Sequence, residues 1–540
     1  MRRRNPNRRI LLLILWILAC ALLFILSFPR FFTDNGILNP GSYKTLEKDS
    51  SAENPLKYVG TDFSVKRGFH TNLPIVILEI DGELPEYKYF TDNGIEISDK
   101  DIEPYTSGQM TVIYNENGES TPFDAPIYES GIRIKKRGHT SMAFDKPQYK
   151  IKTFLPDGTN NDTSILGMGE GNDWILNGSL ADKSLIRNYL AYRICSEVGG
   201  NDLSPDVRYC EVLMKSDGVL KYNGVYLLSE SIDAGPERVN IEKTGKKTDY
   251  TSYIIRRDRQ TDFDVMLSTY GRLHGFSDQY IGIKYPGKTK LTESLIRYIE
   301  KDYSITERIL YSDRLNEYRL YKKFIDTKSF ADYFLLNEFF GNYDAGEHST
   351  YMYKDSGSKL CIGPVWDFDQ AMNNNSLEEM DTDSIAFHTK PLFDRLVLDR
   401  EFINILKDRY VTLRKSALNE EHINDIIDET VACLRSARKR EWYRYAADYV
   451  HYDEPSPGNY YLQGYLIDGI EIDRMNDDYD QEIYNIRNYL HKHSLVIQKS
   501  LTELYDSTRF DTSPGGYNVY FLILLFAVFA VPSLVINQRK

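Results

Sequence analysis

Residues 342–369 have the sequence NYDAGEHSTYMYKDSGSKLCIGPVWDFD, and this stretch predicts a β-hairpin with acidic residues at both ends. An aromatic run from Thr350 is followed by a turn at Ser356-Gly357 and by a returning apolar run. Positions equidistant from the turn of an antiparallel hairpin lie opposite each other, on strands about 5 Å apart. Asp344 and Asp367 are therefore expected to share one cleft, where one could hold a divalent cation and the other could accept a proton from an attacking hydroxyl. Phosphoryl transfer from a magnesium nucleotide needs this pair, whereas a polar hairpin whose acids cap neighbouring helices is the structural alternative.

The rest of the chain predicts strands first and helices later. Short β-branched runs bounded by turn residues favour strands, and they begin at Leu73, Met110, Gly131, Tyr149, Tyr209 and Gly224. Between them, Asp182 is expected to cap an amphipathic helix that ends at Gly199-Gly200. Long stretches that mix apolar and charged residues predict helices at 327–340, 398–418, 420–445 and 480–505. The predicted fold class is α+β: a bilobal domain with a β-rich first lobe and a mainly helical second lobe.

Both ends of the chain carry apolar runs beside basic residues. Residues 10–28 follow five arginines, and residues 519–536 are followed by Arg539 and Lys540. Each run is long enough to cross a bilayer, although a cleaved signal peptide is the alternative for the first. The positive-inside rule places the tails 1–9 and 537–540 in the cytoplasm. We therefore expect a multi-pass protein of the cell membrane, with two transmembrane helices flanking a linker at 31–65 and an extracytoplasmic domain at 66–510.

The composition restricts the partners of the domain. The chain has 79 acidic and 66 basic residues, for a formal net charge of −13. Such a surface repels phosphate backbones, so no nucleic acid partner is expected, and cationic ligands and metal ions are favoured. The five cysteines form no CxxC pair, which gives a zinc site little support. A bridge between Cys195 and Cys210 is possible, but buried free thiols are the favoured interpretation.

Protein kinases use the same order of loop, strand, turn, strand and Asp-Phe, with Asp367-Phe368-Asp369 in the place of their Asp-Phe-Gly. More specifically, Trp366–Asp369 and Asn342-x-Asp344 resemble signatures of the CotH family of atypical, spore-coat-type protein kinases. Three upstream elements resemble the same family in the same order: an Arg-Gly turn with a lysine-rich strand at 137–152, a helix start at 182–188, and a strand at 224–230. The resemblance spans most of the chain from about residue 70 to residue 500.

The resemblance implies a bilobal atypical kinase domain that uses ATP and Mg²⁺ and phosphorylates Ser or Thr of a cell-surface or coat protein. Asp344 would then be the catalytic residue that orients the acceptor hydroxyl, and Asp367 and Asp369 would bind the metal. The candidates for nucleotide binding are Arg137, Lys146, Lys150, Lys152, Arg187, Asn188 and Glu230. Under the two-residue alternation of a strand, the three lysines lie on one face, where one of them would contact the phosphates.

Two departures from the kinase pattern keep other functions open. Ser349 stands where a protein kinase has the asparagine for a second metal ion, and Asn373 replaces a glycine that often follows the Trp-Asp-Phe-Asp signature. A catalytically silent pseudokinase that acts as a scaffold of the cell envelope is therefore the first alternative. A carbohydrate-active cell-wall enzyme with paired carboxylates is the second.

Overall fold

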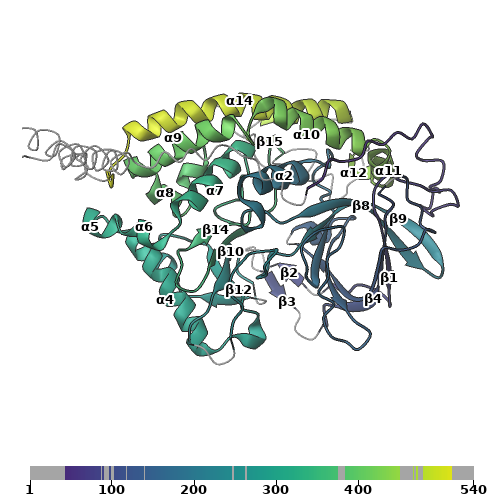
Figure 1. Ribbon diagram of the computed structural model, residues 1–540, viewed down its shortest axis with the longest axis horizontal. Helices are drawn as coiled ribbons and strands as arrows, with labels where there is room; N and C mark the ends of the chain where they lie inside the picture. The colour runs from purple at the N-terminus through teal and green to yellow at the C-terminus, as the bar shows by residue number, and fades with distance from the viewer. Residues whose placement is uncertain are drawn as a thin grey trace, which may run out of the picture.

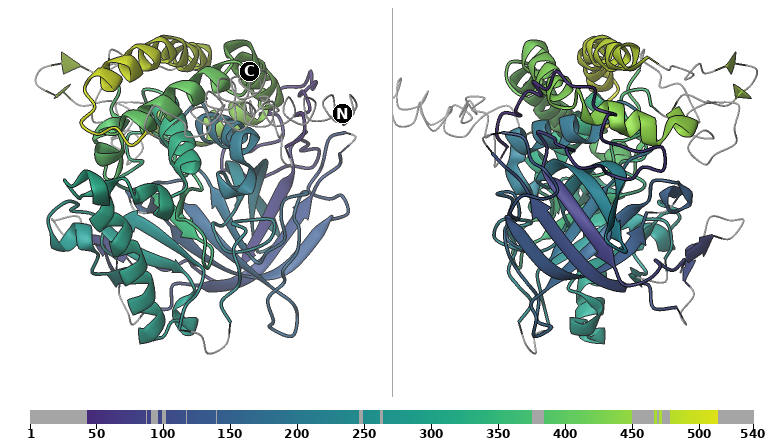
Figure 2. Two further views of the ribbon diagram at one scale, coloured as in Figure 1. Left: turned by 60° about the vertical axis from the view of Figure 1, so that its left-hand side comes forward. Right: turned by 90° about the vertical axis from the view of Figure 1, so that its right-hand side faces the viewer.

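The computed structural model describes residues 43–513, except for residues 87, 91–95, 99–101, 117, 139, 246–248, 262–263, 375–383, 450–465, 468–469 and 472–477. Figure 1 shows a barrel of strands on the right, a second sheet with α4 on the left, and a layer of helices across the top. Figure 2 shows the same barrel from two further sides.

Seven strands of the first half close into a barrel in the order β1-β4-β5-β6-β7-β9-β8. The barrel closes where β1 and β8 pair in parallel, with Ile75 opposite Glu211. Successive side chains of a strand point to opposite faces, so alternate residues such as Ile132, Ile134 and Ile151 fill the interior. The barrel is therefore a packed core. Its strands are β1 (Ile75–Ile80), β4 (Thr106–Ile113), β5 (Tyr128–Arg137), β6 (Gln148–Phe154), β7 (Asp173–Asn177), β8 (Val207–Ser216) and β9 (Val219–Glu230).

A second, five-stranded sheet has the order β11-β12-β10-β13-β14. One of its faces is apolar, because Ile255, Ile281, Ile283 and Met352 belong to the largest hydrophobic core. Its strands are β10 (Tyr253–Asp258), β11 (Val265–Leu267), β12 (Tyr280–Tyr285), β13 (Thr350–Lys354) and β14 (Cys361–Ile362). Two small hairpins are formed by β2 (Lys88–Phe90) with β3 (Glu96–Ser98) and by β15 (Leu466–Ile467) with β16 (Ile470–Glu471).

Helices cover the apolar face of the second sheet and the neighbouring end of the barrel. α7, α9 and α14 contact one another, and α2 contacts α7 and α10 in the same core (Figure 1). The α-helices are α2 (Arg187–Gly199), α3 (Tyr270–Leu273), α4 (Glu293–Leu310), α5 (Leu315–Tyr318), α6 (Tyr321–Phe324), α7 (Thr327–Phe340), α8 (Phe393–Leu396), α9 (Arg400–Arg414), α10 (Glu420–Cys433), α11 (Ala437–Arg444), α12 (Ala446–Tyr449) and α14 (Tyr479–Asp506). Short 3₁₀ turns are η1 (Thr140–Ala143), η2 (Gly200–Asp202), η3 (Lys288–Lys290) and η4 (Phe387–Thr389).

Helix α11 connects the late part of the chain to the barrel through buried charges. Arg440 donates two hydrogen bonds of 2.7 Å to the carboxylate of Glu211 in β8. The next residue, Glu441, accepts a 2.6 Å hydrogen bond from the ammonium of Lys146, and both side chains are fully buried. Two ion pairs in the interior thus hold the barrel against the helices.

The structure corrects the predicted fold class. The first lobe is a closed barrel, and the second half contains, beside its helices, a five-stranded sheet of which only the hairpin β13-β14 was predicted. The prediction was wrong because β10 and β12 are short strands far from their partner β13 in sequence, so no local pattern joins them. The helix expected after Asp182 begins at Arg187, where the Asp182 carboxylate accepts the Arg187 N–H. Cys195 and Cys210 are buried free thiols.

The predicted membrane topology is also corrected. Among the residues that the structure describes, no helix is both long and apolar enough to cross a membrane. The two segments for which spans were predicted, 10–28 and 519–536, lie outside those residues. Apolar length and basic flanks were the whole basis of that prediction, so neither the two-span topology nor the cell-membrane location is retained.

Candidate active site

The end of α7 positions the first candidate carboxylate. Gly341 ends the helix in the left-handed conformation, with φ of 61°, and the chain then turns into the loop that carries Asp344. The side-chain amide of Asn342 donates to Asn337 Oδ1 at 3.1 Å and to the carbonyl oxygen of Trp366 at 3.1 Å. Asn342 thereby fixes the loop before β13 against the Trp-Asp-Phe-Asp segment after β14.

The loop from residue 344 to residue 349 is a tight turn. The carbonyl oxygen of Asp344 accepts the N–H of His348 at 2.8 Å, and the N–H of Gly346 donates to Thr350 Oγ1 at 2.7 Å. The buried guanidinium of Arg257 donates to the carbonyl oxygen of Gly346 at 3.0 Å. The Asp344 side chain is half-buried, and no described residue donates a hydrogen bond to its carboxylate. The two carboxylate oxygens of Asp344 are therefore available to accept a hydrogen bond from the hydroxyl of a substrate.

The second carboxylate is held from α2. The N–H of Asp367 donates to the hydroxyl of Tyr192 at 3.1 Å, and the N–H of Phe368 donates to Asn188 Oδ1 at 2.7 Å. The Phe368 ring packs edge-on against the rings of Tyr192 and Phe340. Asp367 itself has φ of 68°, a conformation that is uncommon for a residue with a Cβ and is found at functional sites.

The loop that carries Asp344 lies against Asp367, because the hydroxyl of Ser349 in that loop is 3.5 Å from Asp367 Oδ2. Burial raises the pKa of Asp367 to about 6; Arg137 opposes this shift, whereas Asp344 and Asp258 add to it. Burial also raises the pKa of Asp369 well above its usual range, with Asp367 as the next cause. The predicted hairpin is formed by β13 and β14, which brings the loop of Asp344 and the segment of Asp367 to the same end of the hairpin, while the roles of the two carboxylates stay predictions.

The departures from the kinase pattern have local explanations. Ser349 lies beside Asp367, since its hydroxyl is 3.5 Å from Asp367 Oδ2. Asn373 has φ of 58°, in the left-handed region that glycine and asparagine tolerate best, so asparagine keeps the backbone path of the glycine that it replaces. Gly138 of the Arg-Gly turn has φ of 116°, and a Cβ there would lie 2.0 Å from Ser141 Oγ. Only glycine fits that turn.

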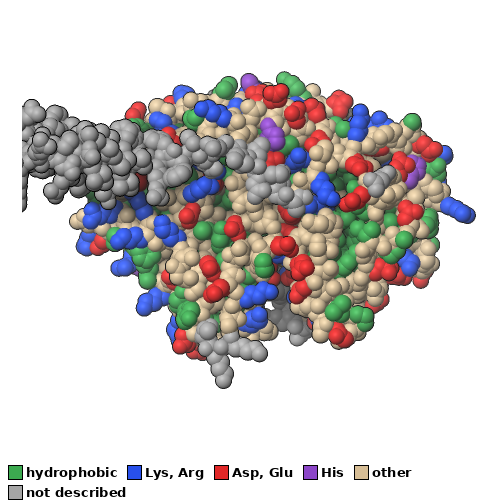
Figure 3. Space-filling model, viewed as in Figure 1, with side chains coloured by type: hydrophobic (Ala, Val, Ile, Leu, Met, Phe, Trp, Pro, Cys, Tyr) green, Lys and Arg blue, Asp and Glu red, His purple; other side chains and the backbone are tan. Residues whose placement is uncertain are grey.

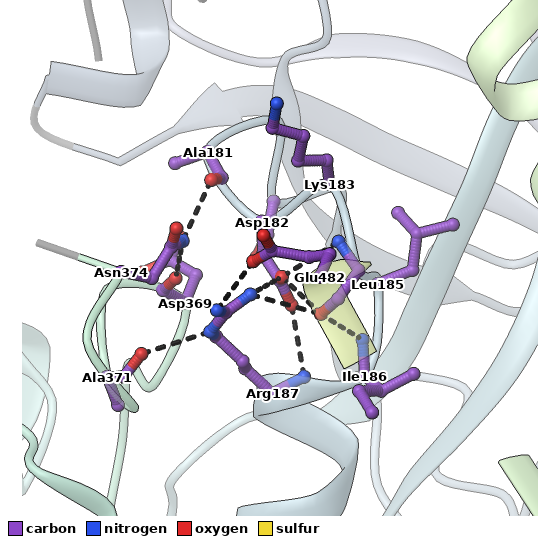
Figure 4. A network of polar contacts seen from close by, with 12 residues as sticks. Ala181, Asp182, Lys183, Leu185, Ile186, Arg187, Asp369, Ala371, Asn374 and Glu482 are labelled. Atoms are coloured by element: carbon purple, nitrogen blue, oxygen red, sulfur yellow. Dashed lines mark hydrogen bonds and ion pairs between the residues drawn. The ribbon is translucent and has the colours of Figure 1, made fainter. Parts of the chain in front are cut away.

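Arg187 and its neighbours form a buried network that supports the site (Figure 4). Arg187 is 1% exposed and forms ion pairs with Asp182 at 2.7 Å and Glu482 at 2.6 Å, and its Nε donates to the carbonyl oxygen of Ala371. The amide of Asn374 donates to the carbonyl oxygen of Ala181. The network joins the loop after Asp369 to the start of α2. The charge of Arg187 is neutralised by the carboxylates of Asp182 and Glu482.

The predicted lysines have different surroundings. Lys150 and Lys152 lie on one face of β6 and form ion pairs with Asp173, at 3.1 and 3.9 Å. Lys146 precedes the strand, is 1% exposed, and donates to Glu441 and to the carbonyl oxygen of Val225. Burial lowers the pKa of Lys146, while Glu441 opposes that shift. The structure therefore separates Lys146 from the other two.

Arg137 and Glu230 complete the set of predicted residues. Arg137, at the end of β5, donates to Gln148 Oε1 at 2.7 Å and stacks on the Trp366 ring, 5.4 Å from its centroid. Glu230 ends β9 and is 1% exposed; its carboxylate accepts the N–H groups of Gly169 at 2.6 Å and Asp206 at 3.2 Å. Burial and then Asp206 raise the pKa of Glu230 to about 7. Arg137 lies at the site, whereas Glu230 holds two loops of the first lobe.

The charged face of the second sheet was not predicted from the sequence. Arg256 and Asp258 of β10 and Lys284 of β12 lie on the face opposite the apolar core, and Arg259 follows β10. Asp258 and Arg259 both act on the pKa of Asp367. The alternation of isoleucine with Gly282 and Lys284 was the signal for a half-buried strand. Figure 3 shows a hollow between the two halves of the molecule with charged side chains of both signs on its rim.

The residues present are compatible with Mg²⁺. No group of three or more Asp, Glu, His or Cys side chains is arranged to hold a metal within the described part of the chain. Mg²⁺ keeps several waters and is usually bound through one or two carboxylates plus substrate phosphates, so a complete protein cage is not required. The raised pKa of Asp367 reflects a buried carboxyl near other acids, an environment that a divalent cation would relieve.

Comparison with known proteins agrees with this geometry. No curated protein matches the chain. A family model described as CotH kinase protein matches residues 134–496, which is more than half of the chain and runs from β5 into α14. The matched region contains Arg137, the lysines of β6, Asp344 and Asp367, and it indicates a kinase-like function. The chain therefore belongs to the CotH kinase family.

Proposed function

We propose that this protein is an atypical protein kinase that transfers the γ-phosphoryl group of ATP to a Ser or Thr hydroxyl of a coat or surface protein. The observation that carries the proposal is that the loop of Asp344 lies against Asp367 at the open end of the hairpin β13-β14, with Arg137 on the neighbouring Trp366 ring. The matched family supports the reaction class. Asp344 has an oxygen pair available to a hydroxyl, and Asp367 is a half-buried carboxylate suited to a metal.

In the proposed reaction, the bond between the γ-phosphorus and the oxygen that bridges it to the β-phosphate breaks, and a bond to the acceptor oxygen forms. Asp344 orients the acceptor hydroxyl and receives its proton, while ADP leaves. Asp367, with Asp369, would hold Mg²⁺, which would neutralise charge on the phosphates when bound. Arg137 extends the positive potential from the first lobe toward the same position.

The test uses the purified full chain with Mg²⁺ and γ-labelled ATP, and follows label on the protein itself and on an added Ser- and Thr-rich protein. Asp344→Asn and Asp367→Asn should each reduce transfer by about 10²–10⁴-fold, the range for loss of a positioned acid–base group or charge. Asp408→Asn, at an exposed position of α9, is the control and should keep wild-type activity. Wild-type rates in both site variants would contradict the assignment.

A catalytically silent scaffold that binds nucleotide is the second candidate. Ser349 favours it, because a serine hydroxyl 3.5 Å from Asp367 stands where a protein kinase has the asparagine for its second metal ion. Nucleotide binding without transfer of label in the same experiment would select this function.

A further inference from the structure

Lys284 lies on the side of the second sheet that faces away from the hydrophobic core. Its neighbours Ile281 and Ile283 are buried in that core, so the alternation of β12 places Gly282 and Lys284 on the opposite face. Gly282 lies opposite Arg256 of β10 in the register. Lys284 therefore shares the charged face that carries Asp258 toward Asp367.

The positive charge of Lys284 has no counterion of its own. The side chain is half-buried, and no described residue forms a hydrogen bond or an ion pair with its ammonium group. Its acidic neighbour is Asp264, whose carboxylate already pairs with Arg256 at 2.7 Å. Burial lowers the pKa of Lys284 to about 8; Asp264 opposes the shift, whereas Arg256, Lys150 and Arg137 add to it.

Arg137 of the first lobe is one of the cations whose charge lowers the pKa of Lys284. Arg137 donates a hydrogen bond to the neutral amide of Gln148 and stacks on the ring of Trp366, and it forms no ion pair with the described residues. By contrast, Lys150 is paired with Asp173. Lys284 and Arg137 thus repel each other electrostatically, and Arg137 stacks on the ring of Trp366, the residue before Asp367. Neither cation forms an ion pair with the described residues.

A half-buried cation without a counterion is unfavourable, and charge-assisted hydrogen bonds that the cation donates to an anion offset that cost. We propose that Lys284 and Arg137 together bind the polyphosphate of the nucleotide, with Lys284 as the phosphate-binding lysine that the second lobe supplies. This inference rests on the proposed function for the identity of the ligand. A polyphosphate chain suits the site, because it carries several charges in a row and can bridge cations that come from two lobes.

The experiment measures binding of inorganic tripolyphosphate and of ATP by calorimetry, with the full chain and no acceptor protein. Lys284→Met removes the charge at nearly constant length and should weaken both ligands by about 10- to 100-fold, as expected for loss of a charge-assisted hydrogen bond. Lys284→Arg restores a cation and should recover most of the affinity. Lys290→Met, at an exposed position that follows β12, should bind like the wild type. Circular dichroism on each variant checks that the fold is kept.

Equal affinities of the wild type and Lys284→Met would overturn the inference, as would a wild type that binds neither ligand. The two proposals fail separately. Lys284-dependent binding of tripolyphosphate without any phosphoryl transfer would refute the kinase activity and leave the anion site standing. If Lys284→Met keeps both the transfer activity and the ATP affinity of the wild type, the anion site is refuted and the kinase activity stands.

Discussion

The buried pair of Lys146 and Glu441 makes the sharpest prediction, because the sequence presented Lys146 as a ligand for phosphate and the structure surrounds it with protein. Replacing Lys146 by methionine leaves the Glu441 carboxylate buried, with hydrogen bonds only from the Val225 N–H at 2.7 Å and the Tyr449 hydroxyl at 3.3 Å. Removal of one partner of a buried ion pair destabilises a protein by about 3–5 kcal/mol. We expect a loss of this size in the free energy of unfolding of Lys146→Met.

The reverse replacement, Glu441→Gln, should destabilise less, by about 1–3 kcal/mol. Lys146 keeps its hydrogen bond to the carbonyl oxygen of Val225 and its contacts with the rings of Tyr226 and Tyr445, 4.9 and 5.6 Å from the centroids. Burial already lowers its pKa, so the amine can also lose its proton. The double variant should then lose less than the sum of the two single losses, with a coupling of about 1–3 kcal/mol.

Urea unfolding followed by tryptophan fluorescence measures the three variants, and calorimetry at low temperature measures their affinity for Mg·ATP. If Lys146 has only a structural role, the variants should have lower unfolding midpoints, and their folded forms should bind Mg·ATP with the affinity of the wild type. The opposite pattern, a wild-type midpoint with ATP binding lost in Lys146→Met, would refute this reasoning and restore Lys146 as the phosphate ligand.

Three further predictions concern the support of the site and the surface. Arg187→Met leaves two buried carboxylates, one of them Glu482, without their cation, and should lower the free energy of unfolding in urea by about 3–5 kcal/mol. The hydrogen bond to Glu197 raises the pKa of His422 in the folded protein. The pair therefore stabilises the fold fully below the ordinary histidine pKa of about 6.5, and this contribution is lost as the pH rises through the pKa of His422 in the folded protein. His422→Gln should therefore lose about 1 kcal/mol near pH 5.5 and less near pH 8.5, as measured by urea titration at both values. Asn373→Ala should be less stable than Asn373→Gly by about 1 kcal/mol, because alanine is strained at φ of 58° whereas glycine is not.

Each of these has a matched comparison. Arg297→Met removes an exposed cation from a helical pair with Glu293 and should change stability by less than about 0.5 kcal/mol, so an equal loss in Arg187→Met would argue against the buried network. A constant difference between His422→Gln and the wild type at both pH values would mean that the pair does not titrate. Equal midpoints for the two Asn373 variants would remove the conformational explanation.

The sequence predicted best what short-range chemistry determines. The hairpin around Ser356-Gly357 follows from a turn and its flanking strands, and Asp344 and Asp367 at its open end are only 23 residues apart. The prediction that Lys146 shares a strand face with Lys150 was wrong, because β6 begins only at Gln148 and Lys146 lies outside the strand. Alternation is a rule for strand residues and does not extend past the strand end.

Long-range partners could not be predicted from the pattern. Nothing near Arg187 indicates that Glu482 of α14 neutralises it, and nothing in β1 indicates that β8 lies beside it in parallel. The charged face of the second sheet was missed for the same reason, since β10, β12 and β13 meet only after the loops between them fold back. These contacts depend on the whole fold, whereas propensity and spacing act over a few residues.

The ion pairs that α11 makes with the barrel also constrain how the protein can be made. Lys146 and Glu441 are 295 residues apart, and Glu211 and Arg440 are 229 residues apart. All seven barrel strands therefore emerge from the ribosome long before the residues that neutralise these two buried charges. Until α11 is synthesised, a closed barrel would contain an uncompensated ammonium and an uncompensated carboxylate. The nascent first lobe should consequently remain a client of chaperones until translation has passed residue 441.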